Sequence, residues 1–149
     1  MFFEQMHPSW QDALKEFQPL LDEIEAKLDS ASNPYVPKKS LVMRAFQQPL
    51  DHTRVLIVGQ DPYPTAGHAI GLSFAVNTDV KTLPRSLKNI LIELKDDLGK
   101  SVTAEGDLSA WSQQGVLLLN RHLTTDLAEA GAHTEIGWSK FTDAVIRVL

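Results

Sequence analysis

The chain has 149 residues, of which 43% are hydrophobic and 22% charged, values that are ordinary for one soluble globular domain. It contains no cysteine, which excludes disulfide bonds and thiolate metal sites and favours a reducing, cytoplasmic setting. No stretch is long and apolar enough to span a bilayer, so we expect a soluble protein without a membrane partner.

The net charge of -5 comes from one segment of the chain. Residues 1–30 hold seven acidic residues and two lysines, whereas twelve acids balance twelve bases in residues 31–149. Lys81, Arg85 and Lys88 form a basic stretch without acidic residues. Because local patches decide contact with phosphates, the acidic net charge does not exclude binding to a nucleic acid.

The first predicted elements are two short helices. Apolar residues recur at helical spacing from Trp10 to Leu28, which indicates one buried face. Pro19 interrupts the pattern, and because proline lacks an amide donor and clashes with the preceding turn, we expect it to open the second helix. A loop with two prolines is predicted at 32–39, followed by a short helix at 40–46.

Three continuous apolar runs are predicted as strands, at 55–58, 72–76 and 116–119. Runs of this kind, without alternating polar residues, are typical of strands that are buried on both faces. Strands that alternate with helices predict an α/β fold with three layers, in which helices flank a short, mainly parallel sheet. No internal repeat or second domain is visible, so we expect a single domain over residues 1–149.

A crossover helix is predicted between the second and third runs. Its apolar face consists of Leu87, Ile90, Leu91, Leu94 and Leu98. Ser86 can cap this helix and Gly99 can end it. A further short helix is predicted at 107–114, and a last one within 137–149.

Polar and aromatic residues follow the predicted strands, where open α/β sheets bind their ligands. Prolines follow Asp61 and Tyr63 directly and push both residues into extended geometry, which aims their side chains. Asn120 ends the third run and offers a donor and an acceptor side by side. Singly, Asp61 reads as a turn former, Asn120 as a loop cap and Phe74 as core. Together they predict a pocket for a flat heterocycle.

Five segments carry a resemblance to a known family. They are GQDPYP at 59–64, GLSF at 71–74, LPRSLKNI at 83–90, GVLLLN at 115–120 and HTEIGWSKFTD at 133–143. With these motifs in this order, the chain resembles the family 1 uracil-DNA glycosylases from about Pro8 onward, in the bacterial variant that has Pro64 in place of the histidine of GQDPYH. The resemblance implies a base-excision repair enzyme that hydrolyses the N-glycosidic bond of deoxyuridine in DNA, leaves an abasic site and needs no metal or cofactor.

The resemblance also implies roles for the residues of the predicted pocket. Asp61 is expected to activate water and Phe74 to stack on uracil. Asn120 can donate to O4 and accept from N3–H of uracil, whereas cytosine presents the reverse pattern and would leave polar groups unpaired. Tyr63 is expected to exclude the methyl group of thymine, and the backbone amides of Gln60 and Phe74 to hold the base.

Further expectations concern DNA and the histidines. Pro84 and Ser86 lie in a segment similar to the DNA-compressing loop of the family, which implies a phosphate contact for Ser86; a simple helix cap is the alternative. His133 matches a family histidine and either supports the water site or is a solvated loop residue. His68 and His122 lie in no matching motif. The expected partners are uracil-containing DNA, free uracil as product and a protein inhibitor of the DNA-binding site, and we expect a cytoplasmic monomer.

The later part of the family pattern has no match in this chain. A fourth strand, a glycine-serine phosphate loop and a loop of the form HPSPLS follow in that family, whereas this sequence stops at DAVIRVL. The resemblance thus implies a C-terminally truncated domain without the histidine that stabilises the uracil anion and without the leucine wedge. The alternative function is a truncated, inactive remnant or a module that binds uracil or DNA without turnover. An unrelated nucleotide-binding protein is disfavoured, because neither GxxxxGK[ST] nor GxGxxG follows a predicted strand.

Overall fold

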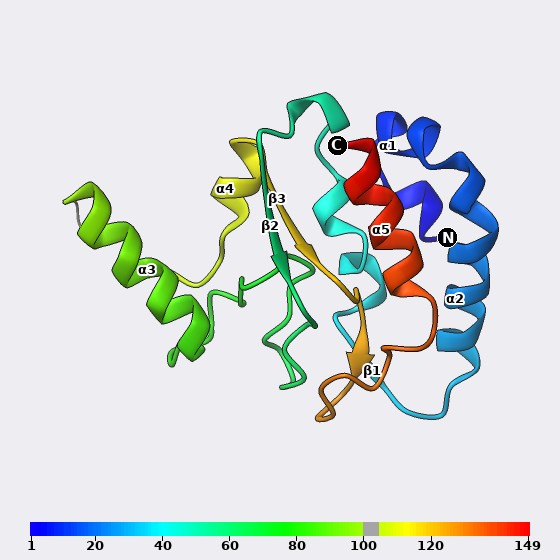
Figure 1. Cartoon of the computed structure of the whole chain (residues 1–149). Coiled ribbons are helices and arrows are strands. Elements are labelled where there is room, and N and C mark those ends of the chain that lie inside the picture. Colours follow the sequence, from blue (N-terminus) through cyan, green and yellow to red (C-terminus); the bar gives the residue numbers. More distant parts are fainter. Residues whose placement is uncertain (100–104) are drawn as a thin grey trace.

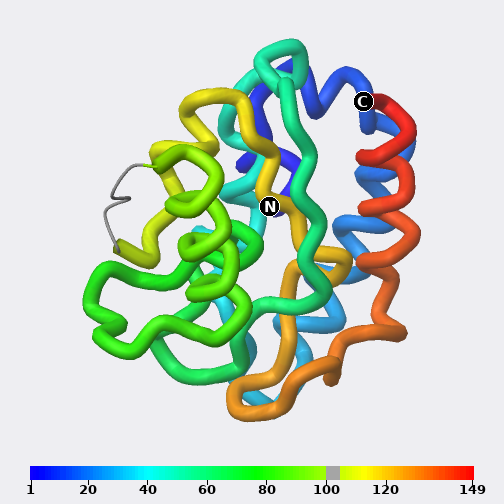
Figure 2. Tube along the Cα trace, turned by 60° about the vertical axis from the view of Figure 1, so that its left-hand side comes forward, coloured from blue at the N-terminus to red at the C-terminus, as the bar shows by residue number. Residues whose placement is uncertain are grey.

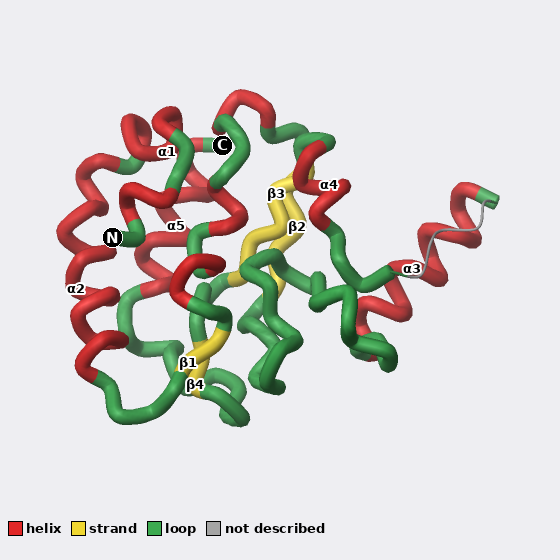
Figure 3. Tube along the Cα trace, turned by 180° about the vertical axis from the view of Figure 1, so that it is seen from behind, coloured by secondary structure: helices red, strands yellow, loops and turns green. Residues whose placement is uncertain are grey.

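The computed structural model describes residues 1–99 and 105–149, which form three layers (Figure 1). Two parallel strands, β2 (Val55–Gly59) and β3 (Val116–Asn120), lie in the centre. The helices on one side are α1 (Pro8–Ala13), α2 (Gln18–Ser30) and α5 (Trp138–Val148), and those on the other are α3 (Arg85–Leu98) and α4 (Ser109–Gln113). The predicted α/β fold class is confirmed, and Figure 3 shows the same layers from behind.

The two central strands pair in the register that brings their carboxyl ends together. Val55 lies opposite Val116, and Gly59 lies opposite Asn120. The chain between them passes through α3 and α4, as a parallel pair requires a crossover connection. A second, antiparallel pair joins β1 (Tyr35–Val36) to β4 (Thr125–Asp126).

The predicted strand at 72–76 is wrong. The segment lies in the connection from β2 to α3, whose path Figure 2 shows, and no strand is formed there. Positive φ angles at Gly71 (80°) and Phe74 (63°) turn the backbone away from extended geometry. Ser73 instead donates its N–H to the carbonyl of Leu118, over 3.1 Å, and its hydroxyl to the carbonyl of Ile57, over 3.3 Å. The segment is therefore a tight loop that is hydrogen-bonded to both central strands.

The burial of β2 also differs from the prediction. Val55 is 50% exposed and Val58 is 45% exposed, because β3 is the only strand that pairs with β2 in the described part of the chain. In contrast, residues 117–120 of β3 are buried. Of the two central strands, only β3 has the two-sided burial that its apolar sequence predicts.

The N-terminal third follows the prediction in outline. Pro19 lies in the first turn of α2, where its missing N–H leaves no intrahelical bond unmade. The loop at 32–39 contains β1, and in place of a helix at 40–46 there are separate 3-10 turns. The 3-10 turns in the described residues are η1 (Phe3–Gln5), η2 (Lys15–Phe17), η3 (Lys39–Leu41), η4 (Arg44–Phe46) and η5 (Leu50–His52). Segments this short form single turns more easily than an α-helix.

The predicted N-terminal cap of α3, Ser86, is wrong, whereas the predicted end of the helix at Gly99 is confirmed. Pro84 is the N-cap, while Ser86 is exposed in the first turn and makes no capping bond. Gly99 ends the helix in the left-handed conformation with φ of 61°. No helix in the described residues is long and apolar enough to cross a membrane.

Aromatic side chains form the centre of the main core. Trp10, Phe46, Phe141, Trp138 and Phe2 follow one another with ring centroids 5.4 to 6.4 Å apart. All five rings are buried. This continuous row joins α1, η4 and α5, so the layer of helices beside β3 is rigidly packed and gives the strand ends a firm support.

Candidate active site

The site begins where β2 and β3 end. Beyond the last strand pair, the N–H of Arg121 donates to the carbonyl of Gly59 over 2.8 Å, and the N–H of His122 to that of Gln60 over 3.0 Å. The segments that follow β2 and β3 therefore stay side by side beyond the ends of the two strands. This register brings Asp61, which follows β2, close to Asn120 at the end of β3.

Gly59 allows three side chains to converge on the strand end. A Cβ at this position would lie 2.4 Å from Oδ1 of Asn120, 3.1 Å from Cβ of Ser73 and 3.5 Å from Cε2 of Phe74. Any larger residue would displace the amide of Asn120. The glycine thus provides the space in which amide and aromatic ring meet.

The loop after β2 is held by Tyr63. Its hydroxyl donates to the carbonyl of Phe74 over 2.9 Å, which joins the two halves of the connection between β2 and α3. Burial raises the pKa of the Tyr63 phenol, so the hydroxyl remains a donor at neutral pH. The prolines at 62 and 64 restrict the backbone on both sides of it.

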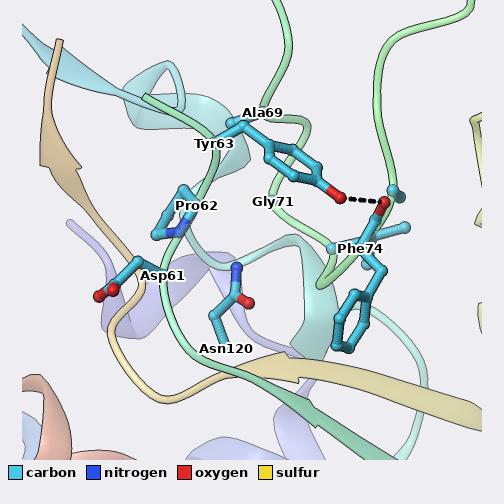
Figure 4. Close-up of a pocket in the computed structure, with 9 residues that line it drawn as sticks. Asp61, Pro62, Tyr63, Ala69, Gly71, Phe74 and Asn120 are labelled. Carbon is cyan, nitrogen blue, oxygen red and sulfur yellow. Dashed lines mark hydrogen bonds between the residues drawn. The ribbon is translucent and has the colours of Figure 1, made fainter. Parts of the chain in front are cut away.

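A small cavity lies among these residues (Figure 4). It is lined by Asp61, Pro62, Tyr63, Ala69, Gly71, Leu72, Phe74, Ala75 and Asn120. The amide of Asn120 points into the space beside the Phe74 ring and the Tyr63 ring, whereas the carboxylate of Asp61 points away from it. With a volume of about 10 Å³, the cavity has room for one water molecule. A flat heterocycle is larger than this cavity, so it can enter only if the lining residues move apart.

Four predicted site residues, Asp61, Tyr63, Phe74 and Asn120, thus line one cavity. Gln60 lies next to them, with an exposed side chain and with its carbonyl bonded to the backbone of His122. Pro84 and Ser86 lie at the start of α3, outside the cavity lining.

Sequence reasoning missed His122. Its Nδ1 lies 2.7 Å from Oδ1 of Asp61, and both side chains are only 11% exposed. No motif marks this histidine. Its place two residues after Asn120, at the end of a predicted parallel strand, was the available signal, because the neighbouring strand ends at the same edge.

His133 lies in a different hydrogen-bond chain. Trp138 donates its indole N–H to Oγ1 of Thr124 over 2.7 Å, and Oγ1 lies 2.8 Å from Nδ1 of His133. Nε2 of His133 lies 2.8 Å from Oδ1 of Asp126, whose other oxygen accepts from Asn33 over 3.0 Å. Every group is paired when the Thr124 hydroxyl donates to Nδ1 and His133 donates from Nε2. His133 is therefore a buried link between β4 and α5 and not a solvated loop residue.

The hydrogen bonds from Asn33 and from His133 lower the pKa of the Asp126 carboxyl, against the opposing effect of burial.

Among residues 1–99 and 105–149, no group of three or more His, Asp or Glu side chains is arranged to hold a metal ion. The residues that line the cavity at the strand ends provide a carboxylate, an amide and two aromatic rings, and groups of these kinds commonly line pockets for organic molecules.

Comparison with known proteins finds close relatives. A protein of Thermobifida fusca named uracil-DNA glycosylase is 47% identical over 152 residues, covering 98% of this chain and 65% of that protein. One of Parafrankia, with the same name, is 50% identical over 150 residues, covering 97% of this chain and 65% of that protein. The chain thus spans about two thirds of the length of these curated relatives. No family model matches the chain.

Known structures give the same result for the fold. The crystal structure of mimivirus uracil-DNA glycosylase superimposes with a TM-score of 0.88 at 30% identity, covering 99% of this chain and 58% of that one. A variant of the viral enzyme, crystallised in complex with UGI, has the same TM-score at 31% identity and covers 100% of this chain and 59% of the viral chain.

Proposed function

The chain is homologous to the uracil-DNA glycosylases over 97–98% of its residues, and on this basis we propose that it hydrolyses the N-glycosidic bond of deoxyuridine in DNA. The products are free uracil and an abasic site, the first step of base-excision repair. The observation that carries the proposal is the cavity at the ends of β2 and β3, where the amide of Asn120 lies beside two aromatic rings and Asp61 belongs to the lining. Within the family, the motif GQDPYP at 59–64 supports assignment to the bacterial variant of family 1.

Asn120, Tyr63 and Phe74 would select the base. The buried amide of Asn120 points toward the cavity, where its donor and acceptor match the O4 and N3–H edge of uracil. The Phe74 ring beside it would stack on the base, and the Tyr63 ring would leave no room for a 5-methyl group. Base entry requires that the Tyr63 and Phe74 side chains move apart.

Asp61 would act on the sugar. Its carboxylate points away from the amide and the ring that would hold the base, as expected for a group that faces the deoxyribose and not uracil. A water molecule oriented by Asp61 adds to the anomeric carbon, and the carbon–nitrogen bond breaks with its electron pair on uracil. The carboxylate stabilises the positive charge that develops on the sugar, and the proton from water balances the uracil anion.

DNA would approach from the side of α3. Pro84 and Ser86 at its start, with the exposed Lys81, Arg85 and Lys88, would contact the phosphate backbone. A protein inhibitor is a further proposed partner, since a viral relative forms a complex with UGI. We also propose that the chain forms one domain and acts as a monomer in the cytoplasm.

Uracil release from a single-stranded oligonucleotide that contains one uracil, with protein in excess, tests this function. Asp61→Asn is expected to lower the rate by a hundredfold or more, on the order of the loss of one charge-stabilising group. Asn120→Asp is expected to release cytosine, because its protonated carboxyl can present the opposite edge pattern. Asp51→Asn, in the exposed turn η5, serves as the control. Absence of release by the folded chain, or equal rates for Asp61→Asn and the wild type, would refute the proposal.

A further inference from the structure

We propose that His122 is a positioning residue for Asp61: its Nδ1–H holds one carboxylate oxygen and so directs the other toward the sugar and the attacking water. This inference rests on the proposed function and deepens it, because it assigns a role to a histidine that belongs to none of the matched motifs. His122 acts through Asp61 and needs no contact with the base.

The contact has the geometry of a strong hydrogen bond. The two atoms are 2.7 Å apart, a distance typical of bonds in which one partner is charged. Both side chains are largely shielded from water, so solvent competes little for either group. A bond of this kind restricts rotation of the carboxylate about the Cβ–Cγ bond.

Both partners are anchored by the same strand register. The backbone N–H of His122 donates to the carbonyl of Gln60, the residue before Asp61, over 3.0 Å. Backbone and ring of His122 therefore bind two successive residues of the loop after β2. The sheet sets the separation of the segments that follow β2 and β3, so little conformational freedom is lost when the His122 ring and the Asp61 carboxylate meet. The orientation of the carboxylate is therefore set before DNA binds.

The tautomer follows from the same contact. The carboxylate of Asp61 can only accept, so Nδ1 carries the hydrogen. Donation from Nδ1 orients the carboxylate through one of its two oxygens.

Two substitutions of His122 separate the positioning role from packing. Phenylalanine keeps the ring and removes the donor, whereas asparagine places its Nδ2 donor as many bonds from Cα as Nδ1 of histidine. We expect His122→Phe to lower kcat for uracil release about a hundredfold with KM nearly unchanged, and His122→Asn to remain within about tenfold of the wild type. His52→Asn, an exposed histidine at the opposite end of β2, is the control. Full kcat in His122→Phe, or an equal loss in both variants at unchanged thermal stability, overturns the proposal.

A second measurement does not depend on the reaction. ¹⁵N NMR of the histidine rings should find the Nδ1–H tautomer for His122 in the wild type and a change of tautomer in Asp61→Ala. An Nε2–H tautomer in the wild type, or no change in Asp61→Ala, shows that the bond is absent and overturns the proposal. If the wild type releases no uracil, the proposed function fails and the positioning role fails with it, while the NMR result still reports whether His122 holds Asp61.

Discussion

The phenol of Tyr63 is restrained at two points, by the prolines beside it and by its hydrogen bond to the carbonyl of Phe74. Since burial raises the pKa of this phenol, its hydroxyl stays protonated near neutral pH and keeps its hydrogen bond to the carbonyl of Phe74. The bond therefore holds the ring at the wall of the closed cavity, and under the proposed function this ring would limit the size of the base that fits once the cavity opens.

Tyr63→Ala is expected to release thymine slowly from DNA, because the truncated wall leaves room for the 5-methyl group. Uracil release should become slower at the same time, since the loop loses its bond to Phe74. Chromatography of bases freed from oligonucleotides with one thymine or one uracil measures both. Tyr35→Ala, in β1, is the matched control. A folded Tyr63→Ala variant that frees no thymine would show that another residue excludes the methyl group.

The lowered pKa of Asp126 determines how this residue's contribution to stability depends on pH. Its pKa is lowered in the folded chain, chiefly by Asn33 and then by His133. The ionised carboxylate therefore stabilises the fold at pH values above its unfolded pKa of about 4, and this contribution disappears as the pH falls through the folded pKa. Asp126→Asn should have a lower Tm than the wild type at pH 6, with a difference that shrinks below pH 4. Asp51→Asn is the control, and a difference that is constant with pH would contradict the assignment.

The elements divide into those that local sequence determines and those that tertiary contacts determine. The central strands, the start of α2 at Pro19 and the end of α3 at Gly99 were predicted, because apolar runs, proline and glycine act locally. The strand predicted at 72–76 was wrong, because an apolar run does not reveal the positive φ of Phe74.

The position of a candidate-site residue was likewise predictable where a local sequence signal marks it, and not where it depends on a contact between distant segments. Asp61, Tyr63 and Asn120 stand next to local signals, a proline or the end of an apolar run, that place them at strand ends. The bond between His122 and Asp61 depends on the pairing of two strands that are far apart in sequence, and no local pattern reports that pairing.

Substitution of Gly71 measures how closely the loop after β2 packs against the backbone of Leu41. A Cβ there would lie 1.8 Å from the carbonyl oxygen of Leu41, so Gly71→Ala should destabilise the fold by about 3 kcal/mol. Gly67 has a similar φ of 76° with nothing within 4 Å of its Cβ position, so Gly67→Ala should cost about 1 kcal/mol. Urea unfolding gives both values. Equal losses would mean that backbone strain alone, and not the approach of Leu41, requires the glycine.

Charge is segregated across the whole molecule. The excess of acidic residues lies in residues 1–30, which include α1 and α2, while Lys81, Arg85 and Lys88 lie around the start of α3. These elements occupy opposite sides of the central strands (Figure 1). Under the proposed function, the basic side would meet DNA while the acidic side repels it, which would orient the encounter.

The salt dependence of DNA binding tests this arrangement. If all three basic residues contact phosphates, replacing them with glutamine should reduce the slope of log K against log salt by about 2 on single-stranded DNA. Lys15→Gln, in η2 on the acidic side, should leave the slope unchanged. Fluorescence anisotropy at several salt concentrations measures the slopes. An unaltered slope in the triple variant would place the DNA on another surface.

The open side of β2 has a consequence for the exchange of amide hydrogens with solvent. In its register with β3, the N–H groups of Val55, Ile57 and Gly59 point toward β3. The N–H groups of Leu56 and Val58 point to the other side, where no strand of residues 1–99 or 105–149 pairs with β2. Deuterium should therefore replace the hydrogens of Leu56 and Val58 quickly and those of the other three slowly, an alternation within a single strand. Any strand that docks along this side, from the same chain or from another, would slow exchange at Leu56 and Val58 alone, so these two amides can report the docking.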